Sequence, residues 1–228
     1  MNSQTTVFST PSTTGSSASG SRQTDQPDQE NMRPSLQHLQ QRFASLHQKR
    51  EPLPCFLDFE ASSLSHRSYP IEVAYSLENG WVESHLIRPP EFLDWQDWSA
   101  EAEALHGISR DLLSCGGRPP VQVVATLNRA LRGRVVYCDG GDYDRFWLSR
   151  LYQAAGMKPS FRLADCAELF EGHLAPGVLE RLARRARGAM YQRHRAALDV
   201  GYLQSLWQLV RAETRRLGAT RTLPMLSA

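Results

Sequence analysis

The sequence predicts an α/β protein in which helices cover a mixed β-sheet. Two observations support this fold class. Apolar runs typical of strands occupy 54–60, 70–77 and 81–88, and the turn dipeptide Asn79-Gly80 separates the last two. Further along the chain, segments with helical periodicity alternate with short apolar runs. A meander of three strands followed by alternating helices and strands indicates a sheet with both antiparallel and parallel pairs.

The later elements follow in chain order from their boundary residues. After the Pro89-Pro90 break, SAEAEALHG is typical of a short helix, and the next helix begins on proline and ends at Gly133. The apolar run RVVYC predicts a buried strand, and the helix after it ends at Gly156. We therefore expect helices at 99–107, 119–133, 142–156, 176–187 and 194–217, and strands at 134–139 and 161–166.

Composition divides the chain into a tail and a folded body. Residues 1–50 are rich in Ser, Thr, Gln, Gly and Pro at their start and have few large apolar side chains there, so we expect them to be disordered. A lead-in helix is predicted at 35–50, where leucines recur at helical spacing. The folded domain is placed at 51–218, with a short tail at 219–228.

Charge and cysteine usage indicate where the protein resides but not what it binds. The net charge of +2 neither favours nor excludes nucleic acid. The four cysteines are widely spaced with no C-x-x-C pair, which is typical of buried thiols in a reducing compartment. The sequence has no apolar stretch as long as a membrane span and no secretion signal. We therefore expect a cytoplasmic protein without a membrane partner.

Two acids interrupt the first predicted strand, in the stretch CFLDFEASSL. Asp58 and Glu60 are two residues apart, so both side chains point to the same face of the sheet. A solvated pair on an exposed strand is one interpretation. The apolar residues before Asp58 favour a central strand instead, where two like charges are costly unless a cation binds them. Ligands that are all oxygen favour Mg²⁺ or Mn²⁺.

Further acids lie where other elements begin. Asp139, Asp142 and Asp144 follow the strand RVVYC, and either a helix cap or a metal ligand fits such a position. Asp142 is the better candidate for a cap. His194 and Asp199, five residues apart at the start of the last helix, could equally be a surface histidine and an ordinary helix acid.

Taken together, these motifs resemble a known family. D-x-E on the first strand, Tyr-Asp before Trp-Leu after a middle strand, and H-x-x-x-x-D on the last helix are similar to the DEDDh (DnaQ-like) 3′-to-5′ exonucleases. The resemblance spans residues 54–210 and includes the segment ALHGIS. It implies a ribonuclease-H-like fold, a five-stranded mixed sheet flanked by helices.

The resemblance also implies roles for individual residues. Asp58, Glu60, Asp144 and Asp199 would hold two divalent cations, Mg²⁺ or Mn²⁺, and His194 would be the general base. Two cations can stabilise the attacking and the leaving oxygens of a phosphoryl displacement, and a histidine can accept a proton near neutral pH. The expected enzyme is a 3′-to-5′ exonuclease that releases nucleoside 5′-monophosphates from single-stranded or frayed nucleic-acid 3′ ends.

Substrate contacts are expected from the residues that follow D-x-E. Ser62 and Leu64 would hold the terminal nucleotide, and Ser63 stands where the family has glycine. His106 is either a further nucleotide contact or a residue at a helix C-terminus beside Gly107.

The middle motif departs furthest from the family pattern, since Asp139 stands where an asparagine is usual. We prefer Asp144 as the ligand and leave open whether Asp142 or Asp139 assists it.

A run of arginines precedes His194 and continues past it, and it is either a solvated helix face or a contact for phosphates, with Tyr191 as a stacking surface. The basic residues are Arg181, Arg184, Arg185, Arg187, Arg193 and Arg195.

Two alternatives to the exonuclease hypothesis remain open at this point. A catalytically inactive nuclease-fold module could bind nucleic-acid ends or a protein partner, or the body could be only a docking module for the N-terminal segment. The partner of the leading hypothesis is the 3′ end of DNA or RNA, and the sequence leaves a homodimer open.

Overall fold

The sheet is mixed and five-stranded, as predicted. The computed structural model describes residues 52–170, 174–175, 177–188 and 194–221, so the predicted segment 1–50 lies outside it. The strand order is β3-β2-β1-β4-β5. β1 pairs antiparallel with β2 and parallel with β4. β2 also pairs antiparallel with β3, and β4 pairs parallel with β5. The strands are β1 (Cys55–Ala61), β2 (Pro70–Ser76), β3 (Val82–Leu86), β4 (Val135–Cys138) and β5 (Arg162–Asp165).

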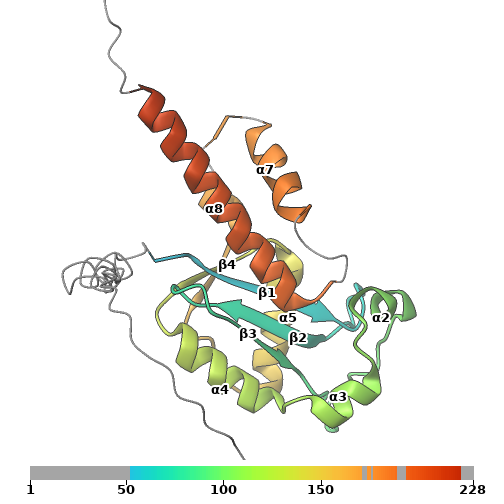
Figure 1. The fold of residues 1–228 in the computed structure, drawn as a ribbon. Helices are drawn as coiled ribbons and strands as arrows, with labels where there is room; N and C mark the ends of the chain where they lie inside the picture. The colour runs from blue at the N-terminus through green and yellow to red at the C-terminus, as the bar shows by residue number, and fades with distance from the viewer. Residues whose placement is uncertain (1–51, 171–173, 176, 189–193, 222–228) are drawn as a thin grey trace, which may run out of the picture. The chain divides into compact units, whose positions relative to one another are not determined.

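Helices cover both faces of this sheet. Figure 1 shows α8 crossing one face and α4 lying against the other. Two short helices, α3 (seven residues) and α6 (five residues), were not predicted. The last helix begins at Ala196 instead of 194 and extends to Arg221. The helices are α2 (Ala100–His106), α3 (Arg110–Gly116), α4 (Pro120–Leu131), α5 (Asp142–Ala155), α6 (Cys166–Phe170), α7 (Val178–Arg187) and α8 (Ala196–Arg221).

The turn between β2 and β3 is longer than expected. Leu77 and Trp81 are paired through a backbone hydrogen bond of 2.9 Å, which leaves a three-residue turn in place of a two-residue one. Gly80 has a φ of 88°, in the left-handed region that favours glycine. A glycine in this conformation after a tight turn is typical of three-residue hairpin loops. The Asn-Gly signal thus located the hairpin but gave its length wrongly.

Alternation along β1 separates the core from the acids. Leu57 and Phe59 are buried with residues of α4 and α5 on one face. Phe56 packs on the opposite face with residues of α7 and α8. Asp58 and Glu60 share the face of Phe56, because side chains two residues apart in a strand point the same way. The two carboxylates therefore lie under the start of α8.

A buried ion pair fixes the start of α8 on the sheet. Glu72 of β2 has a side chain that is 1% exposed, and both of its oxygens accept hydrogen bonds from Arg195, at 2.9 Å from Nε and 2.6 Å from Nη2. The Ala196 backbone N–H donates to the same carboxylate at 3.2 Å. Glu72 therefore caps the first turn of α8 and binds the residue before it, although Arg195 was predicted only as part of a basic run.

Two expectations about location can be compared with the structure. Among the described residues, no helix is long and apolar enough to cross a membrane. All four cysteines are free thiols. The expectation that they are buried is wrong for Cys115, which is exposed on α3, because this helix was not predicted.

We predict that Glu72→Gln destabilises the protein by about 2 kcal/mol. Removing one partner of a buried ion pair costs roughly 3–5 kcal/mol, and the cost is lower here because Arg195 can still reach water. Urea unfolding followed by circular dichroism measures the change. The matched control is Glu213→Gln, which breaks a two-bond Glu213–Arg216 pair on the surface of the same helix and is expected to leave the midpoint nearly unchanged. Equal effects of the two substitutions would contradict the anchoring role.

Candidate metal centre

Carboxylates from two strands and two helices meet where β1 passes under α8. Asp58 and Glu60 come from β1, and Asp139 follows the end of β4. Asp144 and Asp199 lie in the first turns of α5 and α8. Because β1 and β4 are parallel neighbours, their carboxyl ends place Asp58 and Asp139 at the same edge of the sheet.

These carboxylates form two groups that share one residue. In the first, one oxygen each from Asp58, Glu60 and Asp199 lie within 4.8 Å of one another, and in the second the same holds for Asp58, Asp139 and Asp144. All six ligand positions are carboxylate oxygens, the donors that Mg²⁺ and Mn²⁺ prefer. The donor chemistry therefore fits two hard divalent cations with Asp58 between them.

Burial and mutual repulsion raise the pKa values of these acids. Burial raises the pKa of Asp58 well above its ordinary value, and the carboxylates of Asp144 and Glu60 raise it further. Burial, with Asp199 and Glu72 nearby, raises the pKa of Glu60 to about 8, although Arg195 opposes the shift. Burial also raises the pKa of Asp144 to about 7. Without cations, the protein therefore keeps protons on carboxyl groups that would otherwise repel one another.

The turn between β4 and α5 is built around Asp144. Its Oδ2 accepts a hydrogen bond of 3.0 Å from the Gly140 backbone N–H. A Cβ at Gly140 would lie 2.6 Å from that same oxygen, so any side chain there would displace the carboxylate. Asp142 is exposed at the first position of α5 and makes no capping hydrogen bond, so the expected cap is absent. Asp139, and not Asp142, joins the carboxylates.

Asp199 belongs to the first group, and His194 lies five residues before it at the start of α8. His194 is exposed just before α8, and its charge acts on Asp199, where burial is the larger effect and raises the pKa. The Asp199 backbone N–H donates to the Arg195 carbonyl at 3.1 Å, in the first turn of α8. The spacing of five residues thus places the imidazole at the helix start and the carboxylate one turn later.

The loop after β1 is held by its own serines. Ser62 is buried, and its Oγ accepts a hydrogen bond of 3.1 Å from the Tyr69 backbone N–H. Ser63 is also buried and donates its hydroxyl to Asp97. Leu64 has 69% of its surface exposed. The serine that replaces glycine therefore binds protein, and only Leu64 of these three presents its side chain outward.

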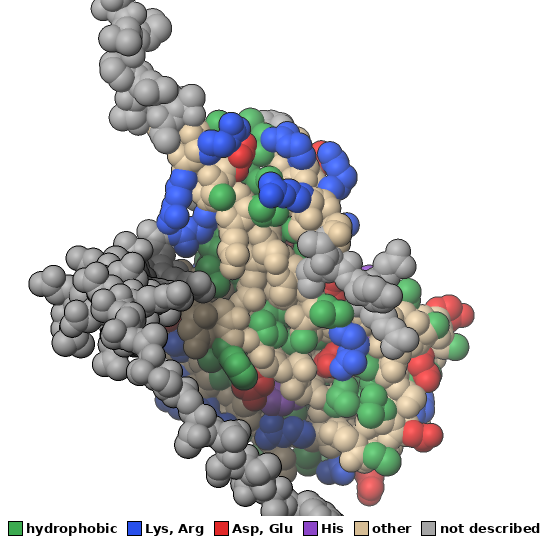
Figure 2. Space-filling model, viewed as in Figure 1, with side chains coloured by type: hydrophobic (Ala, Val, Ile, Leu, Met, Phe, Trp, Pro, Cys, Tyr) green, Lys and Arg blue, Asp and Glu red, His purple; other side chains and the backbone are tan. Residues whose placement is uncertain are grey.

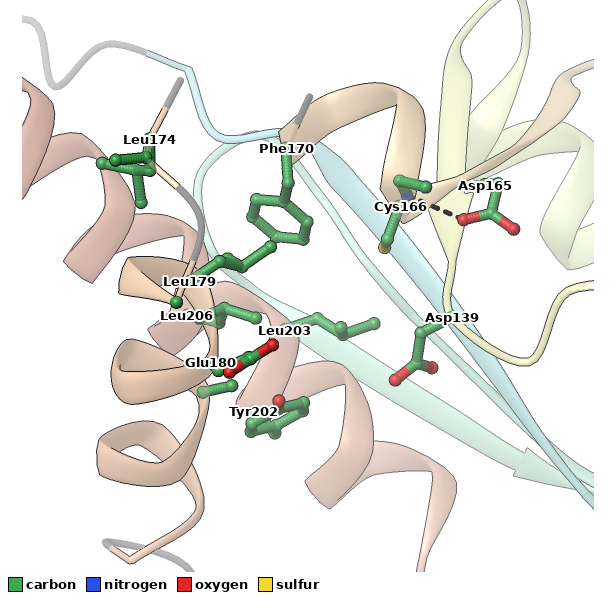
Figure 3. A pocket seen from close by; sticks show the side chains of 14 residues that line it. Asp139, Asp165, Cys166, Phe170, Leu174, Leu179, Glu180, Tyr202, Leu203 and Leu206 are labelled. Carbon is green, nitrogen blue, oxygen red and sulfur yellow. Dashed lines mark hydrogen bonds between the residues drawn. The ribbon is translucent and has the colours of Figure 1, made fainter. Parts of the chain in front are cut away.

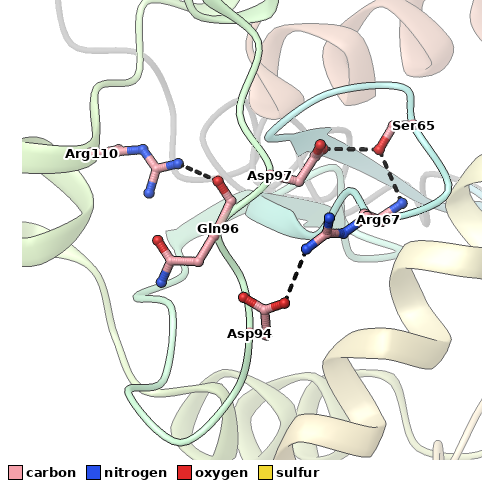
Figure 4. A network of polar contacts seen from close by, with 6 residues as sticks. All are labelled: Ser65, Arg67, Asp94, Gln96, Asp97 and Arg110. Atoms are coloured by element: carbon pink, nitrogen blue, oxygen red, sulfur yellow. Dashed lines mark hydrogen bonds and ion pairs between the residues drawn. The ribbon is translucent and has the colours of Figure 1, made fainter.

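A polar network holds this loop against the segment before α2. Ser65 donates to Asp97 at 3.0 Å, and its oxygen accepts the Arg67 backbone N–H at the same distance (Figure 4). Arg67 also pairs with Asp94 at 3.0 Å. Arg110 donates to the Gln96 carbonyl at 2.6 Å. The position of Leu64 is therefore fixed by contacts on both sides of the loop.

His106 is part of the packing at the end of α2. It is 3% exposed, and its Nδ1 accepts a hydrogen bond of 3.0 Å from the Ile108 backbone N–H. Gly107 is the helix C-cap, with a φ of 69°. His106 therefore occupies the position at a helix C-terminus that the sequence offered as one of two alternatives. The other alternative, a contact between His106 and the nucleotide, stays a prediction.

Basic side chains gather over α7 and the far end of α8 (Figure 2). Arg184, Arg185 and Arg187 occupy the last turn of α7. The guanidinium of Arg187 lies over the ring of Tyr202 at 5.3 Å. Arg193 and Tyr191, which were considered with this run, lie outside the described residues.

Sequence reasoning missed three contributors to this site. Glu72 is an acid within the apolar run PIEVAY, which is the same signal that singled out Asp58. Arg195 follows His194 directly, but the residue that it binds is 123 positions away. The small size required of Gly140 depends on a contact four residues ahead, which becomes visible only once the turn is built.

Comparisons with known proteins bear on the fold. No protein-family model and no curated protein sequence matches this chain. Solved structures of exonuclease I do match. The zinc-bound complex of E. coli exonuclease I with single-stranded DNA has a TM-score of 0.56 and 15% identity over 75% of this chain. The E. coli enzyme with a dA16 oligonucleotide has a TM-score of 0.57 and 15% identity over 73% of this chain. Exonuclease I from Methylocaldum szegediense has a TM-score of 0.53 and 17% identity over 72% of this chain.

The match covers less than half of those proteins. The chain spans 43%, 42% and 41% of the three exonuclease I chains, respectively. At this identity the likeness concerns the fold. The chain therefore has the ribonuclease-H-like fold of the exonuclease I structures, with an acidic cluster on its sheet, as the resemblance of its motifs to DnaQ-like exonucleases predicted.

Proposed function

We propose that this protein is a metal-dependent 3′-to-5′ exonuclease that releases nucleoside 5′-monophosphates from single-stranded or frayed nucleic-acid ends. The observation that carries the proposal is the pair of carboxylate groups that share Asp58. Such an arrangement suits two cations on either side of one phosphodiester. The structural neighbours include exonuclease I complexes with single-stranded oligonucleotides, which supports the same class of substrate.

The proposed ligand set extends the one expected from the sequence. Asp58 would bind both cations, Glu60 and Asp199 would complete one site, and Asp144 with Asp139 would complete the other. Two cations held in this way would supply activation of the attacking water and neutralisation of the leaving 3′-oxygen.

The remaining roles belong to side chains around the carboxylates. His194 is exposed beside Asp199 and would accept the proton of the attacking water. The Glu72–Arg195 pair would hold the start of α8 so that His194 and Asp199 keep their spacing above β1. Leu64, fixed in its loop and exposed, would pack on the last base, and Ser62 and His106 would support the wall around it.

We expect the full chain to shorten 5′-labelled single-stranded DNA or RNA one nucleotide at a time from the 3′ end in Mn²⁺ and not in EDTA. Asp58→Asn should abolish the reaction, because this residue belongs to both carboxylate groups. His194→Ala should slow it by roughly 10²–10⁴-fold, the usual contribution of a general base. Gel analysis of the products measures both effects.

The matched control is Asp111→Asn, the same change at an exposed acid in the first turn of α3. Its activity should equal that of the unmutated chain. If the unmutated chain binds the oligonucleotide but releases no nucleotide with any divalent cation, the enzyme proposal fails in favour of an inactive module that binds nucleic-acid ends.

We predict an unusual dependence of stability on pH in the absence of metal. The folded-state pKa of Glu60 is about 8 against an ordinary 4.5, and that of Asp144 is about 7 against 3.8. The folded protein therefore binds more protons than the unfolded chain across this range, so the free energy of unfolding should fall as pH rises from about 4.5 to about 8.

Thermal unfolding in EDTA and in Mn²⁺ measures this effect. Because cations bind the deprotonated carboxylates, the melting temperature in Mn²⁺ should rise, and not fall, as the pH approaches 8. Asp58→Asn should flatten the EDTA curve. A melting temperature that rises with pH in EDTA would contradict the assigned carboxylate repulsion.

A further inference from the structure

A pocket of about 640 Å³ opens beside the carboxylates, between α6, α7 and α8. Asp139 belongs both to its wall and to the second carboxylate group. Figure 3 shows the Asp139 carboxylate pointing into the pocket, across from Tyr202 and Leu203. The pocket and the metal centre are therefore continuous. Its apolar lining includes Phe170, Leu179, Ala183, Leu203 and Leu206.

The pocket lies on the opposite side of the carboxylates from Leu64. Its wall is formed by residues that follow β4 and β5, whereas the loop that carries Leu64 connects β1 to β2. In the sheet, β4 and β5 lie on one side of β1, and β2 lies on the other. A strand whose last nucleotide contacts Leu64, and whose scissile phosphate lies on the carboxylates, would therefore bring its preceding nucleoside to this pocket.

The chemistry of the lining suits a nucleobase. Aliphatic and aromatic side chains offer faces for a flat ring, and stacking of this kind is tolerant of sequence. The carboxylate of Glu180, on α7, also lines the pocket. Adenine, cytosine and guanine carry exocyclic amino groups that can donate to such oxygens, and thymine and uracil do not.

Arg187 lies where a phosphate of that nucleotide would pass. The guanidinium of Arg187 lies over the ring of the pocket residue Tyr202, 5.3 Å from the ring centre, and the Arg187 side chain is exposed. Its positive charge also acts on Asp139 and Asp199, which places it within electrostatic range of both carboxylate groups. A planar guanidinium can contact a phosphate through two N–H groups.

We propose that this pocket is the subsite for the penultimate nucleoside, with the base among the apolar side chains and Arg187 on its phosphate. The proposal rests on the proposed exonuclease function and adds to it a preference for bases that carry an amino group. The amino group of the base would donate to the Glu180 carboxylate.

Oligonucleotides that differ only at the penultimate position test the base contact. An abasic penultimate residue should lower kcat/KM for release of the terminal nucleotide by about tenfold, the effect expected when one stacked base is lost. The same lesion far upstream should have little effect. Equal rates for intact and penultimate-abasic substrates would overturn the proposal.

Filling the pocket tests its location. Ala183→Phe places a ring in the pocket and should remove most of the difference between intact and abasic substrates. Ala212→Phe, the same change at an exposed residue of α8 outside the pocket, is the control and should preserve the difference. Circular dichroism of both variants shows whether they are folded. If Ala183→Phe is folded and distinguishes intact from abasic substrates as well as Ala212→Phe does, the penultimate base lies outside this pocket.

Two surface substitutions test the polar contacts without risk to the core. Glu180→Gln should reduce the preference for penultimate adenine or cytosine over thymine, and Arg187→Ala should raise KM with little change in kcat. Arg187→Lys should restore only part of the affinity. Unchanged base preference in the first variant and unchanged KM in the second would each count against the subsite.

A binding measurement separates this inference from the proposed function. With Ca²⁺ in place of Mg²⁺, an oligonucleotide carrying 2-aminopurine at the penultimate position should change its fluorescence on binding the full chain. Ala183→Phe should remove the change, and Ala212→Phe should keep it. This result would support the subsite even if no nucleotide were released. Cleavage in Mn²⁺ with no fluorescence response would support the exonuclease and overturn the subsite.

Discussion

The crowding of negative charge on one face of β1 is the constraint on which the rest of the site depends. Asp58 and Glu60 are paired across the sheet with Ala74 and Glu72, and further acids approach from β4, α5 and α8. The mutual repulsion of these carboxylates opposes folding unless protons or cations reduce it. Burial is the largest cause of their raised pKa values and this repulsion adds to it, and bound cations would offset both.

Much of the surrounding structure keeps the carboxylates in place despite this repulsion. Arg195 neutralises the buried Glu72 next to Glu60 and joins the start of α8 to β2. Gly140 allows the chain to turn so closely that its own N–H binds Asp144. The Glu72–Arg195 pair lies on the side of Asp58 that holds Glu60 and Asp199, and the Gly140–Asp144 contact lies on the side that holds Asp139 and Asp144. Each contact therefore holds a different carboxylate group of the proposed metal centre.

The sequence predicted the sheet and the central acids because their signals are local. Alternation in CFLDFEASSL places Asp58 and Glu60 on one face, and the structure has them there. The spacing of His194 and Asp199 likewise reflects one helix start. The length of the β2–β3 turn was wrong because it depends on the pairing of Leu77 with Trp81. The short helices α3 and α6 were missed, whereas α2, as short as α3, was predicted between the Pro89-Pro90 break and Gly107.

Contacts between distant segments account for what was missed. The partner of Arg195 lies on a strand 123 residues earlier, and no spacing rule connects the two. The sequence left open whether Asp139 or Asp142 assists Asp144, and Asp139 shares a ligand group with Asp58 because β4 is the parallel neighbour of β1. Ser63 stands where the family has glycine, and its hydroxyl binds Asp97, which lies 34 residues later in the chain.

Mn²⁺ titration of the full chain, with bound ions counted by electron paramagnetic resonance, tests the central claim most directly. Because two carboxylate groups share Asp58, the chain should bind two ions, Asp199→Asn and Asp144→Asn should each weaken a different one, and Asp58→Asn should weaken both. A single ion per chain, or an Asp58→Asn variant that binds Mn²⁺ as the unmutated chain does, would contradict the shared centre.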